Sequence, residues 1–476
     1  MSTARRIAKN TTILFISQII SYILIFFYTI YIARYLGAEG YGTLSFALAF
    51  SGIFSILADL GLSTLTVREI ARDKSLAKKY LGNALLIKII LAFLTFGLIA
   101  LFVNLLDYPQ ETINVVYFIS LSTISTSMFG IFYSIFQAYE KMEYQSLGQI
   151  LSSILMFFGV LIGPYLGFDV IGFSILYFIS NVIVLGYSFF ICSWKFLIPK
   201  IEYDKYFWKT IIKESLPFGL TSVSIMLYTY IDSVLLSIMQ GNEVVGWYNA
   251  AYKLVLFLVV IPTTINITIF PSMSKFHISS QDSLKLINEK YFKLMIITGI
   301  PLGVATTLLS DKIILLIFGA GYTQSIIALQ ILIWTIVFTF GGASFVRLLE
   351  ATNKQLILTK ITGISVIINI ALNLILIPKF SFVGASIATI LTEIILVSIV
   401  IKINYKLGYG IPTKKILNNL LKISFASLIM GLVIIYLKNL NLLSLSILAI
   451  LTYSVTLLAV KGIDNKDIKI IRQVFK

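Results

Sequence analysis

Ionisable side chains occur inside long apolar stretches of this sequence. In such a setting Asp and Glu can bind cations or protons, whereas Lys and Arg can bind anions. The guanidinium group of Arg also matches two oxygens of one phosphate. A charge at membrane depth costs about 2.5–3.5 kcal/mol on insertion scales, so each such residue is a candidate for a binding site or an ion pair. The apolar stretches contain Asp59, Lys88, Asp232, Lys253, Arg347 and Glu393, and Arg34 and Glu350 stand near their ends.

Asp232 and Lys253 have opposite charges and stand at similar distances along the chain from the same polar turn. Asp232 stands eight residues before Gln240, and Lys253 stands seven residues after Gly246, on either side of a short polar turn. At 1.5 Å per residue of helix, both lie roughly 11 Å from that turn and could pair. Two interpretations stay open, namely a structural salt bridge and a cavity site for substrate charge or a coupling cation.

Polar side chains accompany these charges at helical spacing. Thr221, Ser224, Tyr228 and Asp232 fall on one helix face, which would present them together. Asn249 stands one turn before a charged residue of the next apolar stretch. Ser and Thr also serve as packing residues between membrane helices, so for them packing remains the alternative.

The two arginines suit phosphate but have a simpler explanation. Arg34 and Arg347 both stand near an end of an apolar stretch, from which a long side chain can reach the membrane surface.

The chain has one cysteine, Cys192, and one histidine, His277. These residues cannot form an internal disulfide or a His/Cys metal site.

The composition predicts an all-α polytopic membrane protein. The 476 residues are 58% hydrophobic and 12% charged, whereas soluble domains are about 25% charged. The mean hydropathy is +0.95. Strand-like alternation is absent, which argues against a β-barrel. We expect fourteen membrane-spanning helices, at residues 12–36, 41–66, 81–106, 112–137, 145–166, 169–193, 215–239, 246–271, 290–309, 324–349, 356–377, 381–403, 418–438 and 442–460.

The basic residues predict how these helices are oriented. If the N-terminus is cytoplasmic, nearly all of the 37 Lys and Arg residues fall on the cytoplasmic side. This is the positive-inside pattern, and it places both termini in the cytoplasm of a cell-membrane protein. The net charge of +16 then needs no nucleic-acid partner, because membrane lipids suffice. The exceptions are Arg34, Lys312, Lys379 and Lys438 on the outer side, and Lys88 and Lys253 within spans.

A polar turn occurs twice, which indicates an internal repeat. The stretch "ARYLGAEGYG" contains Gly37, Glu39 and Gly42, and "SIMQGNEVVGWY" repeats this spacing between the first two spans of the second half. The stretches "DVIGFSIL" and "SFVGASIA" recur at a similar offset. Parallel repeats place a substrate site between two lobes, which then alternate in access. We predict an N-terminal lobe at 1–194, a basic cytoplasmic linker at 195–214, a C-terminal lobe at 215–404, and two further helices with a basic tail at 405–476.

The chain resembles the polysaccharide or O-antigen-type flippases of the multidrug/oligosaccharidyl-lipid/polysaccharide exporter superfamily over nearly its whole length. The resemblance is carried by "ARYLGAEGYGTLSFALAF", "DLGLSTLTVREIAR", "YTYIDSVLLSIMQGNEVVGWYNAAYKL", "IFGAGYTQS" and "INIALNLILIPKFSFVGASIATILTE". The last stretch is the most specific, with Asn369, Asn373, Pro378, Gly384, Ala385 and Thr389. Where the family pattern often has Gly after "IPKF", this chain has Ser381.

The resemblance implies two six-helix lobes in a V-shaped pair, with two further C-terminal helices. It also implies a polyprenyl-linked oligosaccharide that moves from the inner to the outer leaflet, its sugar-diphosphate held in a cationic cavity. Within the matching motifs it assigns Asp232 and Lys253 to this cavity, and also Arg34 and Arg68. Other polysaccharide-assembly proteins are the partners it suggests. Our candidates for the cavity are Arg34, Asp59, Arg68, Lys88, Tyr228, Asp232, Asn249, Lys253, Arg347 and Glu393.

Two other functions remain to be weighed against a flippase. A small-molecule or drug efflux antiporter of the same fold would bind cations with carboxylates, and the spans carry both signs of charge. An enzyme would need a sizeable outer loop with catalytic groups, and the short outer loops argue against one. We therefore expect no enzyme activity, no cofactor and no bound metal. Na+ or H+ stays open as a coupling ion, for which Asp232 is the candidate.

Overall fold

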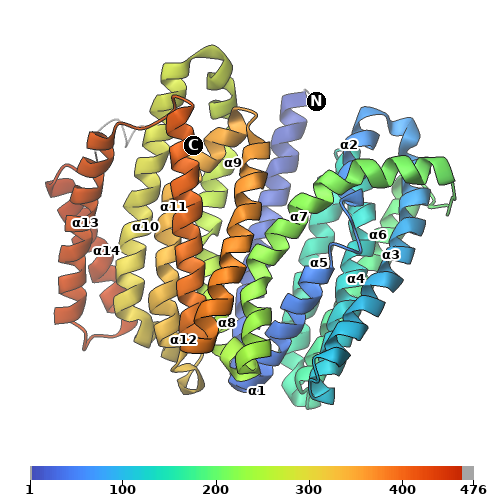
Figure 1. The fold of residues 1–476 in the computed structure, drawn as a ribbon, viewed down its shortest axis with the longest axis horizontal. Helices are drawn as coiled ribbons and strands as arrows, with labels where there is room; N and C mark the ends of the chain where they lie inside the picture. The colour runs from blue at the N-terminus through green and yellow to red at the C-terminus, as the bar shows by residue number, and fades with distance from the viewer. Residues whose placement is uncertain (1–2, 464–476) are drawn as a thin grey trace. The chain divides into compact units, whose positions relative to one another are not determined.

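The computed structural model describes residues 3–463, with the side chains of residue 10 and residues 12–463. The described residues form helices and turns and contain no β-strand. This is the expected solution in lipid, because a helix satisfies its backbone hydrogen bonds within itself. The helices are α1 (Thr3–Phe54), α2 (Leu62–Arg72), α3 (Ala77–Leu105), α4 (Gln110–Ala138), α5 (Met142–Ile162), α6 (Val170–Lys195), α7 (Lys205–Gln240), α8 (Asn242–Leu258), α9 (Val260–Ser279), α10 (Gln281–Ile317), α11 (Ser325–Ala351), α12 (Gln355–Lys406), α13 (Thr413–Tyr436) and α14 (Leu442–Ala459) (Figure 1).

The helices confirm the predicted class of polytopic membrane protein. Within the described range, twelve helical segments are long and apolar enough to cross a membrane. Two of them, Thr12–Phe54 and Gln355–Lys406, have 43 and 52 residues, which is about twice the length that one crossing needs. Each is interrupted by one residue with non-helical backbone angles, Gly37 in α1 and Ser381 in α12. Division at these two breaks gives fourteen crossings, as the sequence predicts.

The break in α12 requires a backbone that most side chains avoid. Ser381 has φ 53° and ψ −135°, in a region that glycine adopts without strain. It is also the position where the sequence departs from the glycine of the family pattern. We expect Ser381→Gly to raise the free energy of unfolding by about 1 kcal/mol, because it relieves this strain. Denaturant unfolding of the purified variant in micelles would measure the change, and an unchanged or lower stability would contradict it.

The repeated polar turn has the same backbone conformation at both of its positions. Gly37 has φ 70° and ψ −178°, and Gly241 has φ 88° and ψ 171°. Both glycines end one long helical stretch and precede the next. The turn recognised in the sequence is therefore a local structural repeat, and its positive φ explains why glycine stands there.

Two expectations about local structure were wrong. The second span was predicted to continue to residue 66, but α1 ends at Phe54, and Asp59 lies in a turn before α2. Residues 272–289, between the eighth and ninth predicted spans, were expected to form a loop but are helical on both sides of Ser280, the N-cap residue of α10. The helices α9 and α10 continue here past the apolar runs, which hydropathy alone does not reveal.

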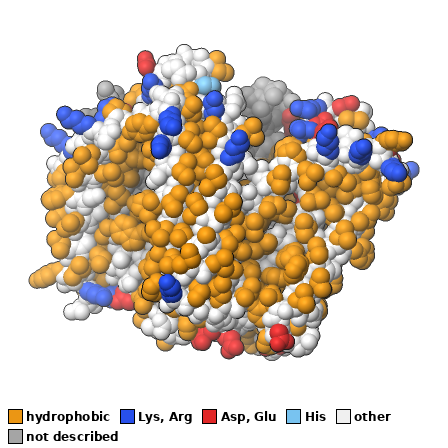
Figure 2. Space-filling view, viewed as in Figure 1, with side chains coloured by type: hydrophobic (Ala, Val, Ile, Leu, Met, Phe, Trp, Pro, Cys, Tyr) orange, Lys and Arg blue, Asp and Glu red, His pale blue; other side chains and the backbone are white. Residues whose placement is uncertain are grey.

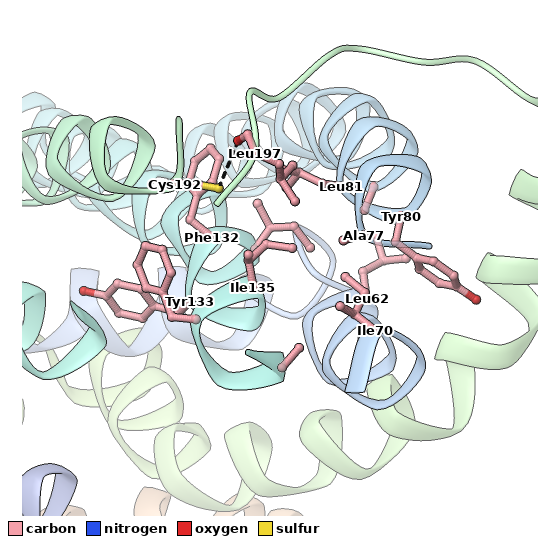
Figure 3. Packing of buried hydrophobic residues seen from close by; sticks show 14 of the residues in the cluster. Leu62, Ile70, Ala77, Tyr80, Leu81, Phe132, Tyr133, Ile135, Cys192 and Leu197 are labelled. Atoms are coloured by element: carbon pink, nitrogen blue, oxygen red, sulfur yellow. Dashed lines mark hydrogen bonds between the residues drawn. The ribbon is translucent and has the colours of Figure 1, made fainter. Parts of the chain in front are cut away.

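The chain divides into two compact units, Met1–Gly246 and Trp247–Lys476. In the first unit, α4 packs on α3 and α6, α1 packs on α5 and α7, and α2 packs on α4 and α7. A cluster of buried side chains from α2, α3, α4 and α6 forms part of its core; it includes Leu62, Leu81, Phe132, Ile135 and Cys192 (Figure 3). This unit includes α7, most of which falls in the C-terminal lobe that the sequence predicts at residues 215–404. The lobe limits stay a prediction about the repeat.

In the second unit, α11 packs on α10 and α12, and α13 packs on α10 and α14. The two C-terminal helices therefore attach to this unit through α10. A buried cluster joins Phe292, Phe345, Val400, Ile423 and Leu457 from five helices. In the view of Figure 2, hydrophobic side chains cover the middle of the helices in each unit, and charged side chains gather near helix ends. This distribution is typical of helices surrounded by lipid.

Candidate functional site

Asp59 and Lys88, both predicted to line a cavity, form an ion pair within the first unit. Lys88 Nζ lies 2.5 Å from Asp59 Oδ1, and the lysine side chain is fully buried whereas 28% of the aspartate side chain is exposed. The same Nζ donates to Ser63 Oγ at 3.0 Å and to the carbonyl oxygen of Ser127 at 2.6 Å. The buried ammonium group thus has three close oxygen partners for its three protons, and Ser127 Oγ lies further away, at 3.4 Å.

The aspartate of this pair also shapes the turn between α1 and α2. Its Oδ2 accepts a hydrogen bond from the amide of Gly61 at 3.1 Å, and its Oδ1 accepts one from Ser63 Oγ at 2.5 Å. Ser127 Oγ donates to the carbonyl oxygen of Ala58 at 2.8 Å. These bonds connect the turn to α2 and α4, while Lys88 connects it to α3. The arrangement is that of a structural ion pair that holds three segments together.

Arg68, on α2, is engaged in ion pairs at the surface of the first unit. Its guanidinium lies 2.5 Å from Glu69 and 2.8 Å from Glu214 of α7. It also stacks over the ring of Phe218, 5.5 Å from the ring centroid. Two carboxylates therefore share the positive charge of Arg68, and its place in the cavity, which the resemblance implied, stays a prediction.

The repeated turn brings α1 into backbone contact with the first residues of α8, which belong to the first unit. A Cβ added to Gly42 would lie 1.7 Å from the carbonyl oxygen of Asn242, and a Cβ added to Gly246 would lie 2.0 Å from that of Ala38. The step along the chain that relates Gly42 to Gly246 also relates Ala38 to Asn242. The two contacts are thus reciprocal, as if related by a two-fold axis. We call these four residues the glycine crossing.

A hydrogen-bond network surrounds the glycine crossing. Tyr108 Oη and Ser237 Oγ lie 2.7 Å apart, and Ser237 Oγ donates to Asn242 Oδ1 at 2.6 Å. Asn242 Nδ2 donates to Thr43 Oγ1 at 3.0 Å. These polar residues were not among the candidates predicted from the sequence. The only signal for them was the repeated turn, which predicted a structure but not its neighbours.

In the second unit, the side chains of α8 contact those of α12. Tyr248 stacks on Tyr252 with ring centroids 5.6 Å apart, and its hydroxyl lies 3.2 Å from Thr389 Oγ1. Asn249 is buried, and Lys253 is exposed. These two candidates, one helical turn apart, therefore lie in the interior of the unit and at its surface, respectively.

The other two charged candidates of this unit have partners on neighbouring turns or helices. Arg347 Nη1 lies 2.5 Å from Glu350 Oε2, and the guanidinium lies 5.3 Å from the centroid of the Phe270 ring. Glu393, which is buried, accepts a hydrogen bond from Thr339 Oγ1 at 2.7 Å. Arg347 is thus neutralised by an acid one turn away.

The remaining candidates differ in exposure. On α7 of the first unit, Asp232 is buried and Tyr228 is partly buried. Arg34 on α1 is exposed, like Lys253 in the second unit. Within the described part of the chain, neither Arg34 nor Lys253 forms an ion pair. Asp232 and Lys253 belong to different compact units, so their pairing stays a prediction.

A metal site is a separate question. Among the described residues, no three or more His, Cys, Asp and Glu side chains group in a way that could hold a metal ion.

The sequence and the fold of the chain are similar to those of several known proteins. The sequence pattern of the family described as "Polysaccharide biosynthesis protein" matches residues 7–277, and that of the MatE family matches residues 217–375. The "Capsular polysaccharide biosynthesis protein CapF" of Staphylococcus aureus is 23% identical over 81% of this chain and 96% of its own. The "Probable low-salt glycan biosynthesis flippase Agl15" of Haloferax volcanii is 24% identical over 81% of each chain. The fold is similar to that of "Lipid II flippase MurJ, inward closed conformation", with TM-score 0.77, 19% identity and coverage of 93% of this chain and 97% of the other.

Proposed function

Because the chain belongs to the polysaccharide biosynthesis protein family, within the multidrug/oligosaccharidyl-lipid/polysaccharide exporter superfamily, we propose that it is a flippase for lipid-linked oligosaccharides. Its substrate is a polyprenyl-diphosphate-linked precursor of a surface polysaccharide, which moves from the inner to the outer leaflet of the cell membrane. Two lobes alternate in access, both termini are cytoplasmic, and the function requires no catalytic residue. Other polysaccharide-assembly proteins supply and consume the substrate.

The exposure of Arg34 and Lys253 is the observation that carries this proposal. Both are exposed basic side chains on helices of apolar composition. A diphosphate is a strong partner for such cations, and Arg can bind it through two hydrogen bonds. The other basic candidates, Lys88, Arg68 and Arg347, already contact carboxylates of their own unit. We therefore assign the headgroup contact to Arg34 and Lys253.

A coupling ion is the second part of the proposal. Asp232 is a buried carboxylate eight residues before the end of α7, within an apolar stretch, a position that suits Na+ or H+ binding. Titration of flipping against a sodium gradient and against a proton gradient would test it. Flipping that is insensitive to both gradients would remove this role from Asp232.

A drug efflux antiporter is the alternative function, and it has its own support. The MatE pattern matches residues 217–375, which include Asp232, Lys253 and Arg347. An antiporter for cationic drugs would need free carboxylates, but Asp59 and Glu350 contact bases. This difference in available charge favours an anionic substrate.

Flipping in reconstituted vesicles is the experiment that tests the proposal. A fluorescent polyprenyl-diphosphate oligosaccharide is placed in one leaflet, and its arrival in the other is followed by reduction with dithionite. We expect the purified protein to accelerate the transfer and Lys253→Ala to lose at least ten-fold in rate, because a charge contact to the diphosphate is removed. Lys402→Ala, which removes another exposed lysine of the second unit, is the matched control and should retain the rate.

Other outcomes of this assay are equally informative. A wild-type protein that transfers several such lipids no faster than empty vesicles contradicts the flippase. Accumulation of a cationic dye under an ion gradient would then establish efflux. An Asp232→Lys/Lys253→Asp double variant that restores a rate lost in both single variants would show that the two residues form a structural pair.

A further inference from the structure

The chain between α6 and α7 exposes large apolar side chains beside lysines. Residues 196–204 are not helical, and the α7 helix begins at Lys205. Five large side chains in and around this stretch are each between 64% and 87% exposed, namely Trp194, Ile198, Ile201, Tyr203 and Tyr206. We call residues 194–213 the surface segment. A water-exposed loop would not be expected to present five such side chains so closely spaced.

The start of the surface segment is held firmly by the first unit. Leu197 is buried among the side chains of the core cluster, and its carbonyl oxygen accepts a hydrogen bond from Cys192 Sγ (Figure 3). Three residues later, the carbonyl oxygen of Lys200 would lie only 2.2 Å from a Cβ added to Gly82 of α3. The segment therefore runs directly along α3, and Ile198 and Ile201 are exposed although the backbone beside them is fixed.

The end of the surface segment is held by polar contacts with α3. Asn83 Oδ1 accepts hydrogen bonds from the amide of Asp204 and from Trp208 Nε1, both at 3.0 Å. Lys79 Nζ lies 3.0 Å from Asp204 Oδ2. The amide of Phe207, which donates to this carboxylate, and the Lys79 ammonium together hold the pKa of Asp204 below its usual value. The exposed apolar side chains thus have a rigid base.

The charge of the surface segment is strongly positive. It contains Lys195, Lys200, Lys205, Lys209 and Lys213, against two acids. One of the acids, Asp204, is already neutralised by Lys79, which lies outside the segment. Lys195 lies over the ring of Trp194, 3.7 Å from its centroid, whereas in the described chain the other four lysines are in no ion pair.

We propose that the surface segment binds anionic phospholipid headgroups at the membrane surface. Its non-helical backbone cannot lie in hydrocarbon, because the polar groups would be unsatisfied there. Trp and Tyr prefer the boundary between headgroups and acyl chains, where the two isoleucines can also insert. Lysines between these side chains reach the phosphates of anionic lipids, and each contributes about fivefold to the local enrichment. Because the segment is fixed to α3, its binding to the headgroups also sets the position of the start of α7 relative to the membrane surface. This binding is independent of the transported substrate.

A fluorescent probe on Ile201 would test this proposal. Cys192 is buried, so a bimane reagent labels the cysteine of Ile201→Cys selectively. The protein is placed in nanodiscs that contain doxyl-labelled phosphatidylglycerol or, at the same fraction, doxyl-labelled phosphatidylcholine. We expect stronger quenching by the labelled phosphatidylglycerol. We also expect Lys200→Gln, Lys205→Gln and Lys209→Gln together to remove most of this difference.

Two controls make the experiment decisive. The same probe on the exposed Tyr165→Cys, in the turn at the other end of α6, should be quenched equally by both lipids, because no lysine lies within twenty residues of it in the sequence. Lys402→Gln and Lys406→Gln, which remove two exposed lysines of the second unit, should leave the preference at Ile201 unchanged. Equal quenching by both lipids at Ile201, no quenching by either, or an unchanged preference in the triple variant would overturn the proposal.

Discussion

Replacing Asp59 with alanine will lower the free energy of unfolding by about 3–5 kcal/mol, because the substitution leaves Lys88 as a buried cation without its carboxylate. The reverse substitution, Lys88→Met, should cost clearly less. Methionine fills the space of the lysine stem, and the side chain of Asp59 is 28% exposed, so that its carboxylate can be hydrated. Denaturant unfolding of each purified variant in micelles, followed by tryptophan fluorescence, measures the difference.

The double variant Asp59→Ala/Lys88→Met completes a thermodynamic cycle. It should be more stable than Asp59→Ala alone, because no buried charge remains. The matched control is the exposed pair of Lys438 and Asp311, whose charged atoms are 3.1 Å apart. Asp311→Ala should cost at most about 1 kcal/mol, as is usual for exposed ion pairs. Equal losses from Asp59→Ala and Lys88→Met would contradict the structural pair.

A flipping assay distinguishes a structural role of Asp59 and Lys88 from the substrate-binding role predicted from the sequence. If Asp59 and Lys88 bind substrate, the single variants should lose flipping while keeping most of their stability. If they hold the turn before α2, the stability should fall, and the double variant should recover flipping together with stability. The contacts with Ser63 and Ser127 favour the second outcome, because they occupy the remaining protons of the ammonium group.

The fourteen crossings could be predicted because apolar length is a local property. Each crossing needs about 20 residues that avoid charge, and the sequence provides such runs with short turns between them. The same measure failed at Asp59, because the stretch "SILADLGLS" remains mostly apolar through the turn. What ends the helix there is a hydrogen-bonded turn with positive φ at Leu60 and Gly61. Hydropathy does not report backbone conformation.

The candidate site was predictable in composition but not in pairing. The spacing of Arg347 and Glu350 is that of an i, i+3 ion pair, and this local pairing could have been predicted. Asp59 and Lys88 stand on different segments, and only the packing of α3 against the turn brings them together. Likewise, the repeated glycines predicted two similar turns. That Gly42 and Gly246 form reciprocal contacts within one unit depends on how α1 packs against the start of α8, which no short motif specifies.

The glycine crossing makes Gly42→Ala the substitution with the second largest expected effect. The added Cβ would lie 1.7 Å from the carbonyl oxygen of Asn242, which is backbone and cannot rotate away. The helices must therefore separate by more than 1 Å, and the hydrogen bond from Asn242 to Thr43 lengthens with them. We expect a loss of about 3 kcal/mol or more in the free energy of unfolding, at the upper end for overpacking.

Because the two contacts of the glycine crossing are reciprocal, we expect the effects of the two glycine substitutions to be non-additive. Gly246→Ala meets the carbonyl oxygen of Ala38 at 2.0 Å and should destabilise the protein for the same reason. Once the helices have separated for one methyl group, the second is accommodated at little further cost, so the double variant should lose less than the sum of the singles. Gly97→Ala on α3, where nothing lies within 4 Å, is the control and should be neutral or stabilising. Strict additivity, or a stable Gly42→Ala variant, would show that the two contacts are not coupled through one helix separation.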